Sequence, residues 1–258
     1  MKVYFMIAKT IANTKKATFA VQVPNPTPNA KGFPSPYGTG FFVSKDGYFI
    51  TARHVLIYKQ NQYEVFFDPS KITLAKPEIF PLPQTTGLKL IKEWVAYDLA
   101  LLKADFEQVK SKDYFKGKNG FDYLDIEFGV PPEGTEVYSF GYPLPDFDVR
   151  GNDIFSVGFH DYRPRITSAI ISSHRNVVGL AWGDAGFPAH YVIDKALNWG
   201  NSGGPIVLQE SGRVISVCTH FEPVNITQGS GHTVTIPSLY GITSSLKNIE
   251  KFLCDLIQ

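Results

Sequence analysis

The sequence predicts an all-β protein that ends in one amphipathic helix, and three observations lead to this fold class. Apolar or alternating segments of about four to eight residues recur along the chain, as they do in strands. Clusters of Gly, Pro, Asp and Ser separate these segments, as turns require. Only the end of the chain repeats its apolar residues at helical spacing.

The predicted strands fall into two groups on either side of a central interruption. The first group covers residues 40–43, 48–51, 63–67 and 99–103, and the second covers residues 136–140, 165–172, 191–193, 205–208 and 214–219. Turn residues at 45–47, 131–134 and 210–212 suit hairpins or short loops. The charged and aromatic segment 106–132 breaks the strand pattern, so we expect it to join two β units, residues 1–125 and 126–258.

The two ends of the chain carry different signals. Leu246, Ile249, Leu253 and Leu256 recur at helical spacing, which predicts an amphipathic helix from residue 245 that lies on the body of the protein. Residues 24–36 are Pro-rich and are expected to form a surface loop. The first 35 residues otherwise match no pattern that places them, and an edge strand, a subunit contact or an autoinhibitory segment all stay open.

Composition and charge exclude several function classes. The chain has 258 residues, enough for one large or two small domains with a buried core. Its 25 basic and 24 acidic residues leave a net charge of +1, so nothing favours a nucleic-acid or membrane partner. Cys218 and Cys254 alone cannot make a disulfide framework or a cysteine metal site, and we expect no cofactor and no metal. The apolar run after Lys2 is too short for a signal peptide or a membrane span, which predicts a soluble, cytoplasmic protein.

A glycine-rich loop displays one serine in the second β unit. Residues 198–207 read NWGNSGGPIV, with Gly200, Gly203 and Gly204 around Ser202. Glycines allow positive φ and close approach, so the backbone N–H groups of such a loop can point at one spot. Ser202 is therefore a candidate nucleophile, provided that a base and an acid reach it from elsewhere. A tight turn or an anion-binding loop would need similar glycines.

A histidine and a carboxylate are needed to activate such a serine. His54 directly follows a predicted strand, where its side chain can face a cleft. The other histidines considered for this role lie in polar or Gly-containing surroundings typical of a surface: His160, His174, His190 and His232. Asp98 stands at the edge of an apolar strand, where a carboxylate is costly unless a group such as a histidine N–H pairs with it. Asp98 could instead cap a turn at the entrance of that strand.

The order His54, Asp98, Ser202 along the chain belongs to the chymotrypsin arrangement of this triad. The chain resembles a trypsin-like serine protease, and most of all the catalytic domain of the bacterial HtrA (Deg) type. The resemblance is carried by GTGFFVSKDGYFITARHVL, YDLALLK, GTEVYSFGYP, ITSAIISS, IDKALNWGNSGGPIV, GRVISV and TIPS. These stretches run from about residue 38 to residue 238 and therefore cover most of the chain.

The resemblance implies two six-stranded antiparallel β-barrels with an active site in the crevice between them, followed by a C-terminal helix. It implies that His54 and Asp98 come from the first barrel and Ser202 from the second. The N–H groups of Gly200 and Ser202 would bind the oxyanion, and the reaction would be hydrolysis of a peptide bond in a protein or peptide substrate.

The resemblance also assigns a pocket for the side chain that precedes the cut bond. Its base and walls would come from Ala196, Leu197 and the strand 217–220, which contains Cys218 and His220. Trypsins carry a carboxylate where Ala196 stands, and glutamate-specific relatives carry a threonine and a histidine about where Leu197 and Cys218 stand. A small or medium apolar side chain should fit best, since burying it is favourable by about 0.8 kcal/mol per CH₂. His220 could bring a polar preference, or it could be a core or rim histidine.

Three departures from relatives are informative. Digestive trypsins have an aspartate at Asn201 that pairs with a newly cleaved N-terminus, so activation by such cleavage is not expected here. Val55 stands where those enzymes have a cysteine beside the histidine, consistent with a fold that uses no disulfides. HtrA proteins usually continue into PDZ domains, whereas this sequence stops about 20 residues after TIPS, which argues against PDZ-based regulation. A regulatory partner or a homo-oligomer stays open.

Two other functions fit parts of the pattern. A trypsin-like module could hold peptide without cutting it, or stay silent until a partner arrives, but the complete set of His54, Asp98, Ser202 and Gly200 favours catalysis. An esterase of the α/β-hydrolase class would need a G-x-S-x-G motif with the acid and histidine later in the chain, whereas Ser202 comes last.

Overall fold

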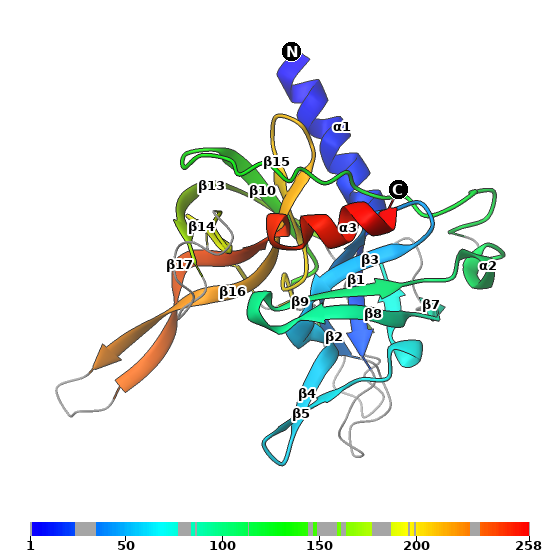
Figure 1. The fold of residues 1–258 in the computed structure, drawn as a ribbon, viewed down its shortest axis with the longest axis horizontal. Helices are drawn as coiled ribbons and strands as arrows, with labels where there is room; N and C mark the ends of the chain where they lie inside the picture. The colour runs from blue at the N-terminus through cyan, green and yellow to red at the C-terminus, as the bar shows by residue number, and fades with distance from the viewer. Residues whose placement is uncertain are drawn as a thin grey trace.

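Two β units lie side by side in the part of the chain that the structure describes, with helices packed around them (Figure 1). The computed structural model describes residues 2–23, 35–76, 84–85, 87–112, 114–143, 147–148, 159–160, 164–176, 187–195, 197–198, 200–227 and 233–257. The first unit is an open sheet and the second is a closed barrel.

The first unit is a seven-stranded antiparallel sheet with the order β7-β6-β1-β2-β3-β9-β8 among the described residues. Its strands are β1 (Thr18–Val23), β2 (Ser35–Phe42), β3 (Tyr48–Ala52), β6 (Thr73–Ala75), β7 (Gln84–Thr85), β8 (Lys89–Trp94) and β9 (Leu99–Lys103). A separate hairpin, β4 (Ile57–Gln60) with β5 (Tyr63–Phe66), projects beside this sheet (Figure 1).

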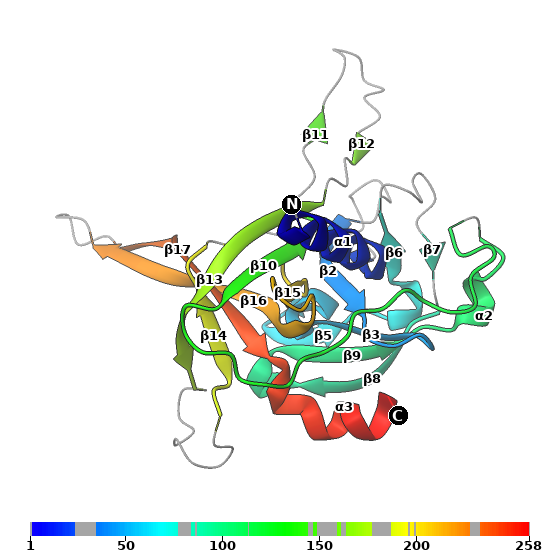
Figure 2. The same ribbon diagram turned by 90° about the horizontal axis from the view of Figure 1, so that it is seen from above.

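The second unit is a closed antiparallel barrel with the order β10-β13-β14-β17-β16-β15. Its strands are β10 (Glu136–Gly141), β13 (Arg165–Arg175), β14 (His190–Ile193), β15 (Pro205–Leu208), β16 (Val214–Thr227) and β17 (Thr233–Ser245). β16 and β17 continue past the barrel as a hairpin that points away from the body (Figure 1). The short strands β11 (Phe147–Asp148) and β12 (Phe159–His160) pair on their own (Figure 2).

The expectation of two six-stranded barrels is right for the second unit and wrong for the first. Over the described residues, the first sheet has seven strands and ends at β7 and β8, each of which pairs on one side only. The hydrogen bonds of β4 and β5 are made to each other. The sheet therefore does not close through this hairpin.

The N-terminal segment forms a helix followed by an interior strand. α1 (Lys2–Ala17) leads directly into β1, whose six residues are all buried and pair with β6 on one side and β2 on the other. Of the alternatives considered for this segment, the edge strand is therefore wrong. The sequence pattern does not predict β1 because a strand buried on both faces, TFAVQV, shows no alternation.

The C-terminal helix is confirmed. A 3₁₀ turn, Leu246–Ile249, leads into α3 (Glu250–Ile257), and the buried residues of this segment are Leu246, Ile249 and Leu253. Strands of the first sheet lie between α1 and α3 in Figure 2. The segment between the units carries the short helix α2 (Phe106–Val109) and an isolated bridge from Ile126 to Val214.

A shared hydrophobic core holds the two units against each other. It joins Phe41 and Ile50 of the first sheet with Tyr138 and Val217 of the barrel, and Leu253 of α3 packs into the same cluster. Side chains in such cores are packed as closely as in organic crystals. The facing edges of the two units therefore keep a defined separation, which is a requirement for a site built from both.

Candidate active site

His54 is placed by a tightly held turn at the end of β3. The 3₁₀ turn Arg53–Leu56 follows β3 directly, and the side chains of Val55 and Leu56 are buried beneath it. The guanidinium of Arg53 forms ion pairs with Glu93 and, at 2.8 Å, with Glu64. These contacts fix the backbone that carries the imidazole.

Asp98 faces this turn from the entrance of β9. It follows the 3₁₀ turn Val95–Tyr97 and adopts a left-handed conformation, with φ 52° and ψ 41°, which Asp tolerates better than most residues. Its N–H donates to the carbonyl of Val95 at 3.2 Å, and its carbonyl accepts the N–H of Arg53 at 2.9 Å. The backbone of Asp98 thus caps the turn, while its side chain remains free to pair with another group.

The Asp98 carboxylate contacts His54 through both of its oxygens. Oδ1 accepts the backbone N–H of His54 at 2.9 Å, and Oδ2 lies 2.5 Å from the ring Nδ1. Because a carboxylate accepts hydrogen bonds, Nδ1 carries the proton and Nε2 is left as the basic nitrogen. The side chain of His54 is 38% exposed and that of Asp98 is 15% exposed, so the imidazole is accessible to solvent and the carboxylate is sheltered.

The Ser202 loop crosses from the barrel and is bound by β2 of the first sheet. The N–H of Thr39 donates to the carbonyl of Ser202 at 2.7 Å, and Thr39 Oγ1 donates to the carbonyl of Gly200 at 2.7 Å. The same Oγ1 accepts the N–H of Tyr142 at 2.9 Å. Thr39 was not predicted, although a polar residue in the apolar strand GTGFF was a signal for it.

The glycines of the loop are required by this close approach. A Cβ at Gly203 would lie 2.0 Å from the carbonyl oxygen of Thr39 and 2.2 Å from Thr51 Oγ1, and its φ is +85°. Gly200 also has a positive φ, +92°. Gly203 therefore excludes a side chain for steric and conformational reasons, and the positive φ of Gly200 disfavours one there.

Two backbone donors of the loop make no hydrogen bond to the described residues. The N–H groups of Asn201, Gly203 and Gly204 donate to carbonyls within the protein. For Gly200 and Ser202, the described part of the chain supplies no acceptor. Two such donors on alternate residues can receive one negatively charged oxygen. A tight turn explains the three N–H groups that bond to carbonyls of the protein. The N–H groups of Gly200 and Ser202 are the ones that an anion-binding loop would use.

Asn201 is buried directly before the serine. It is 4% exposed, and its Oδ1 has no hydrogen-bond partner among the described residues. The carbonyl of Asn201 accepts the N–H of Gly204 at 2.8 Å, which closes the turn. An aspartate here would bury a negative charge without a described partner.

His220 lies beside the His54–Asp98 pair. Its Nε2 is 3.7 Å from Asp98 Oδ2, and the centres of the His220 and His54 rings are 5.6 Å apart. Partial burial lowers the pKa of His220 from its ordinary value; Asp98 opposes this shift and His54 adds to it. The structure thus brings together three predicted site residues from two different units.

The other predicted pocket residues lie deeper. Leu197 and Cys218 belong to the hydrophobic core inside the barrel, and burial raises the pKa of the Cys218 thiol to about 12. Ala196 lies outside the described residues. The preference for a small or medium apolar substrate residue before the cut bond remains a prediction.

The remaining histidines contact other residues or lie outside the described residues. His174 Nε2 contacts the carbonyl of Pro131 at 3.0 Å, and His190 Nδ1 lies 3.2 Å from Ser244 Oγ. Both were predicted to be surface residues, and the structure shows both half-buried. The backbone of His160 is in β12, and His232 lies outside the described residues.

Ser244 supports the acid from the barrel side. Its Oγ donates to the carbonyl of Tyr97 at 2.5 Å, directly before Asp98 in the chain. The contact therefore ties β17 of the second unit to the turn that positions the carboxylate. The sequence holds no local signal for this pairing.

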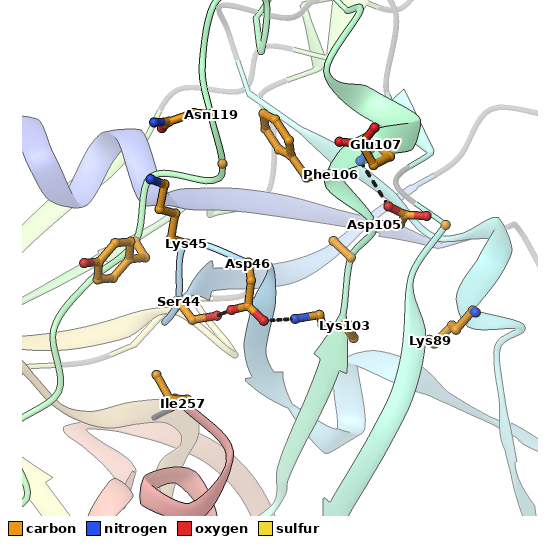
Figure 3. A pocket seen from close by; sticks show the side chains of 14 residues that line it. Ser44, Lys45, Asp46, Lys89, Lys103, Asp105, Phe106, Glu107, Asn119 and Ile257 are labelled. Atoms are coloured by element: carbon orange, nitrogen blue, oxygen red, sulfur yellow. Dashed lines mark hydrogen bonds and ion pairs between the residues drawn. The ribbon is translucent and has the colours of Figure 1, made fainter.

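One pocket adjoins the site and another lies apart from it. One of about 570 Å³ opens beside His54 and is lined mainly by the β4–β5 hairpin, including Tyr58, Lys59 and Glu64. Another of about 740 Å³ lies between the loop after β2 and the segment around α2, and shares no residue with the triad (Figure 3). Asp46 bonds to Ser44 and Lys103 in this second pocket (Figure 3). Partial burial acts to raise the pKa of Asp46. The contacts with Lys103 and Ser44 act in the other direction, and together they hold this pKa below its ordinary value.

Comparison with known proteins gives one consistent result. A family model described as the trypsin-like peptidase domain matches residues 38–217. A probable periplasmic serine endoprotease, DegP-like, of Bartonella henselae is 30% identical over 189 residues, which cover 72% of this chain and 28% of that protein. The chloroplastic Protease Do-like 1 of Arabidopsis thaliana is 26% identical over 224 residues, which cover 84% of this chain and 41% of that protein. The chain thus spans less than half the length of these relatives.

Solved structures show the same fold. A structure of the HtrA-type protease AlgW with a decapeptide aligns with a TM-score of 0.60 at 21% identity, covering 97% of this chain and 67% of that chain. AlgW with a tripeptide aligns with a TM-score of 0.60 at 22% identity, covering 98% of this chain and 64% of that chain.

None of the described helices is long and apolar enough to cross a membrane.

Proposed function

Because the chain belongs to the trypsin-like peptidase family, we propose that it is a serine endopeptidase that uses Ser202, His54 and Asp98. One observation carries the proposal above all others. A histidine whose Nδ1 is bound by a carboxylate belongs to the first sheet, and a serine loop with two unused N–H groups is bound to that same sheet through Thr39. These are the parts that acyl transfer requires.

The reaction follows from the roles of these groups. Ser202 Oγ attacks the carbonyl carbon of the peptide bond while His54 Nε2 takes its proton. The negative charge on the carbonyl oxygen is received by the N–H groups of Gly200 and Ser202. His54 then gives its proton to the leaving amine, and an acyl-enzyme remains. Water, deprotonated by His54, attacks this ester and releases the acid and Ser202.

An edge of β16 that is only partly covered by β15 favours a peptide as substrate. β15 pairs with β16 through residue 217, and Cys218 exchanges hydrogen bonds with Gly203 and Gly204. Beyond this point no described strand covers that edge of β16, although β17 covers the other. An extended peptide could add a strand there and reach Ser202. Solved structures of the HtrA-type protease AlgW with a decapeptide and with a tripeptide support a peptide as the class of substrate.

The specificity we propose is for a small or medium apolar residue before the cut bond. Leu197 and Cys218 both belong to the apolar barrel core, so neither offers a charge to a substrate. The pocket beside His54 would accept residues after the cut bond. His54 lines this pocket, and in the proposed reaction it gives its proton to the amine that leaves with those residues.

Labelling with a fluorophosphonate tests the proposal, because this reagent reacts only with an activated serine. The wild-type chain should be labelled at Ser202 and should cleave a denatured protein. Ser202→Ala should lose both properties and keep its thermal unfolding curve. Ser211→Ala, in an exposed turn, should keep both.

A peptide panel that varies only the residue before the cut bond tests the specificity. Preference for Ala or Val is expected, and a strong preference for Arg or Glu would refute it. Peptide binding without any labelling would favour the non-cutting module.

A further inference from the structure

Three side chains at the candidate active site form a donor set for a transition metal. Ligand atoms of His54, Asp98 and His220 all lie within 4.8 Å of one another. Two imidazoles and one carboxylate, with further positions open, suit Zn²⁺. We propose that this cluster binds Zn²⁺ and that the bound ion switches the peptidase off. The binding stands on the geometry alone, while the inhibition rests on the proposed function.

One ligand-atom separation is already close to that of a tetrahedral zinc site, and the two imidazole rings lie near the spacing that such a site needs. With Zn–N bonds of about 2.0–2.1 Å, two imidazole rings on one ion have centres about 5 Å apart. The rings of His54 and His220 have centres 5.6 Å apart, with 42° between their planes. An imidazole nitrogen and a carboxylate oxygen on the same ion would lie about 3.4 Å apart. His220 Nε2 and Asp98 Oδ2 are 3.7 Å apart.

The third separation shows what the ion must displace. His54 Nδ1 and Asp98 Oδ2 are 2.5 Å apart, too close to hold an ion between them. Zn²⁺ would replace the proton on Nδ1: the N–H bond breaks, the proton passes to solvent, and a Zn–N bond forms. The two atoms would then separate by about 1 Å. The backbone of Asp98 can stay in place during this change, because Arg53 and Val95 hold it.

Zinc on Nδ1 removes the general base. A neutral imidazole has one acceptor nitrogen, and metal binding at Nδ1 leaves the ring proton on Nε2. His54 then cannot take the proton of Ser202. His220 is 56% exposed and His54 is 38% exposed, so an ion can enter from solvent and a water molecule can complete its coordination.

The donor set also predicts which ions act. Mg²⁺ and Ca²⁺ prefer oxygen ligands, and this cluster offers only one carboxylate. Ions that favour imidazole, such as Zn²⁺ and Co²⁺, should bind, while Mg²⁺ should not. Cys254 is exposed and could bind zinc separately, so Cys254→Ser serves as the reference chain.

Calorimetric titration of Zn²⁺ into the 258-residue Cys254→Ser chain tests the site. One strong site per chain is expected, with visible absorption when Co²⁺ is used instead. Losing an outer hydrogen-bond partner of a zinc ligand costs 10- to 100-fold in affinity, so losing a ligand by His220→Gln should cost at least about 100-fold. His174→Gln, which changes a histidine outside the cluster, should bind zinc as the reference does. Unchanged affinity in His220→Gln, or no strong site in the reference, would overturn the proposal.

Peptide hydrolysis at increasing Zn²⁺ tests the inhibition. Turnover by the reference should fall as the site fills, and Mg²⁺ at the same concentrations should have no effect. Whatever its own rate without metal, His220→Gln should need at least about 100-fold more Zn²⁺ for half inhibition. Strong binding at His220 without inhibition would refute the switch. A chain that binds zinc but hydrolyses no peptide would refute the endopeptidase and keep the metal site.

Discussion

His54 Nδ1 lies 2.5 Å from Oδ2 of Asp98, and the other carboxylate oxygen accepts the backbone N–H of His54 at 2.9 Å. One carboxylate therefore sets both the tautomer of the ring and its direction. Such a two-point contact leaves Nε2 as the nitrogen that can take a proton.

Asp98→Asn should remove activity while preserving the fold. An asparagine can donate its amide N–H toward Nδ1, which favours the tautomer with the proton on Nε2. In the triad of another enzyme this change lowers kcat by about 10⁴-fold, and we expect a loss of about 10³- to 10⁴-fold here. Steady-state hydrolysis of a peptide ester, with thermal unfolding as the fold check, measures it. Asp255→Asn, on the exposed side of α3, is the matched control. A loss of less than tenfold would contradict the assigned role.

Thr39→Val should disturb the oxyanion site from a distance. It leaves the carbonyl of Gly200 and the N–H of Tyr142 without their partner in a buried place. Each unsatisfied group costs about 1–3 kcal/mol of unfolding free energy, and a shifted Gly200 should lower kcat more than it changes KM. Urea unfolding and peptide kinetics measure the two effects. Thr39→Ser keeps the hydroxyl and should retain most of the stability and of kcat; equal losses in the two variants would contradict the role assigned to the hydrogen bonds.

Lys76→Met should loosen α1 and destabilise the protein. Lys76 is 1% exposed, and its Nζ donates to the carbonyls of Lys15 and Lys16 at the end of α1. Nζ also lies 3.8 Å from the centre of the Phe19 ring. Losing a buried cation with these contacts should cost about 2–4 kcal/mol, measured by urea unfolding. Lys71→Met, at an exposed position, should change stability by less than about 0.5 kcal/mol. Comparable effects in both variants would refute the anchoring role.

Cys218 should make the protein sensitive to alkaline pH. Burial raises the pKa of its thiol from 9.0 to about 12. The unfolded thiol ionises first, so the stabilisation is fully present below about pH 9 and is lost as pH rises toward about 12, by up to about 1.4 kcal/mol per pH unit. Urea unfolding at pH 8 and pH 10.5 should therefore show a steeper decline for wild type than for Cys218→Ala. Cys254→Ala, at an exposed thiol, should decline like wild type; parallel slopes in all three would contradict this.

Asn201→Asp should be destabilising and should not create an activation switch. The position is 4% exposed, and its Oδ1 has no described partner, so a carboxylate there would be charged and unpaired. Removing such a charge from water without compensation typically costs several kcal/mol, and protonation should relieve part of it. Unfolding should therefore occur at lower urea at pH 8 than at pH 5, relative to wild type. Asn198→Asp, exposed in the same loop, should show no such difference.

The amino-acid sequence by itself determined the elements whose signal is local. The apolar runs of β9 and β15 were predicted at their observed bounds, and the spacing of Leu246, Ile249 and Leu253 predicted the C-terminal helix. The order His54, Asp98, Ser202 and the glycines of the loop indicate the proposed chemistry. Such signals are local because turn conformation and periodicity depend on residues a few positions apart.

Only the tertiary structure decided how these elements meet. The interior place of β1, the open first sheet, the Thr39 bridge to Gly200 and the approach of His220 to Asp98 all depend on residues far apart in the chain. No periodicity encodes such pairs, because they form when two units close on a shared core and satisfy the polar groups that become buried there. The sequence therefore predicts which groups react, and packing between the units brings the imidazole to its carboxylate and binds the serine loop to the first sheet.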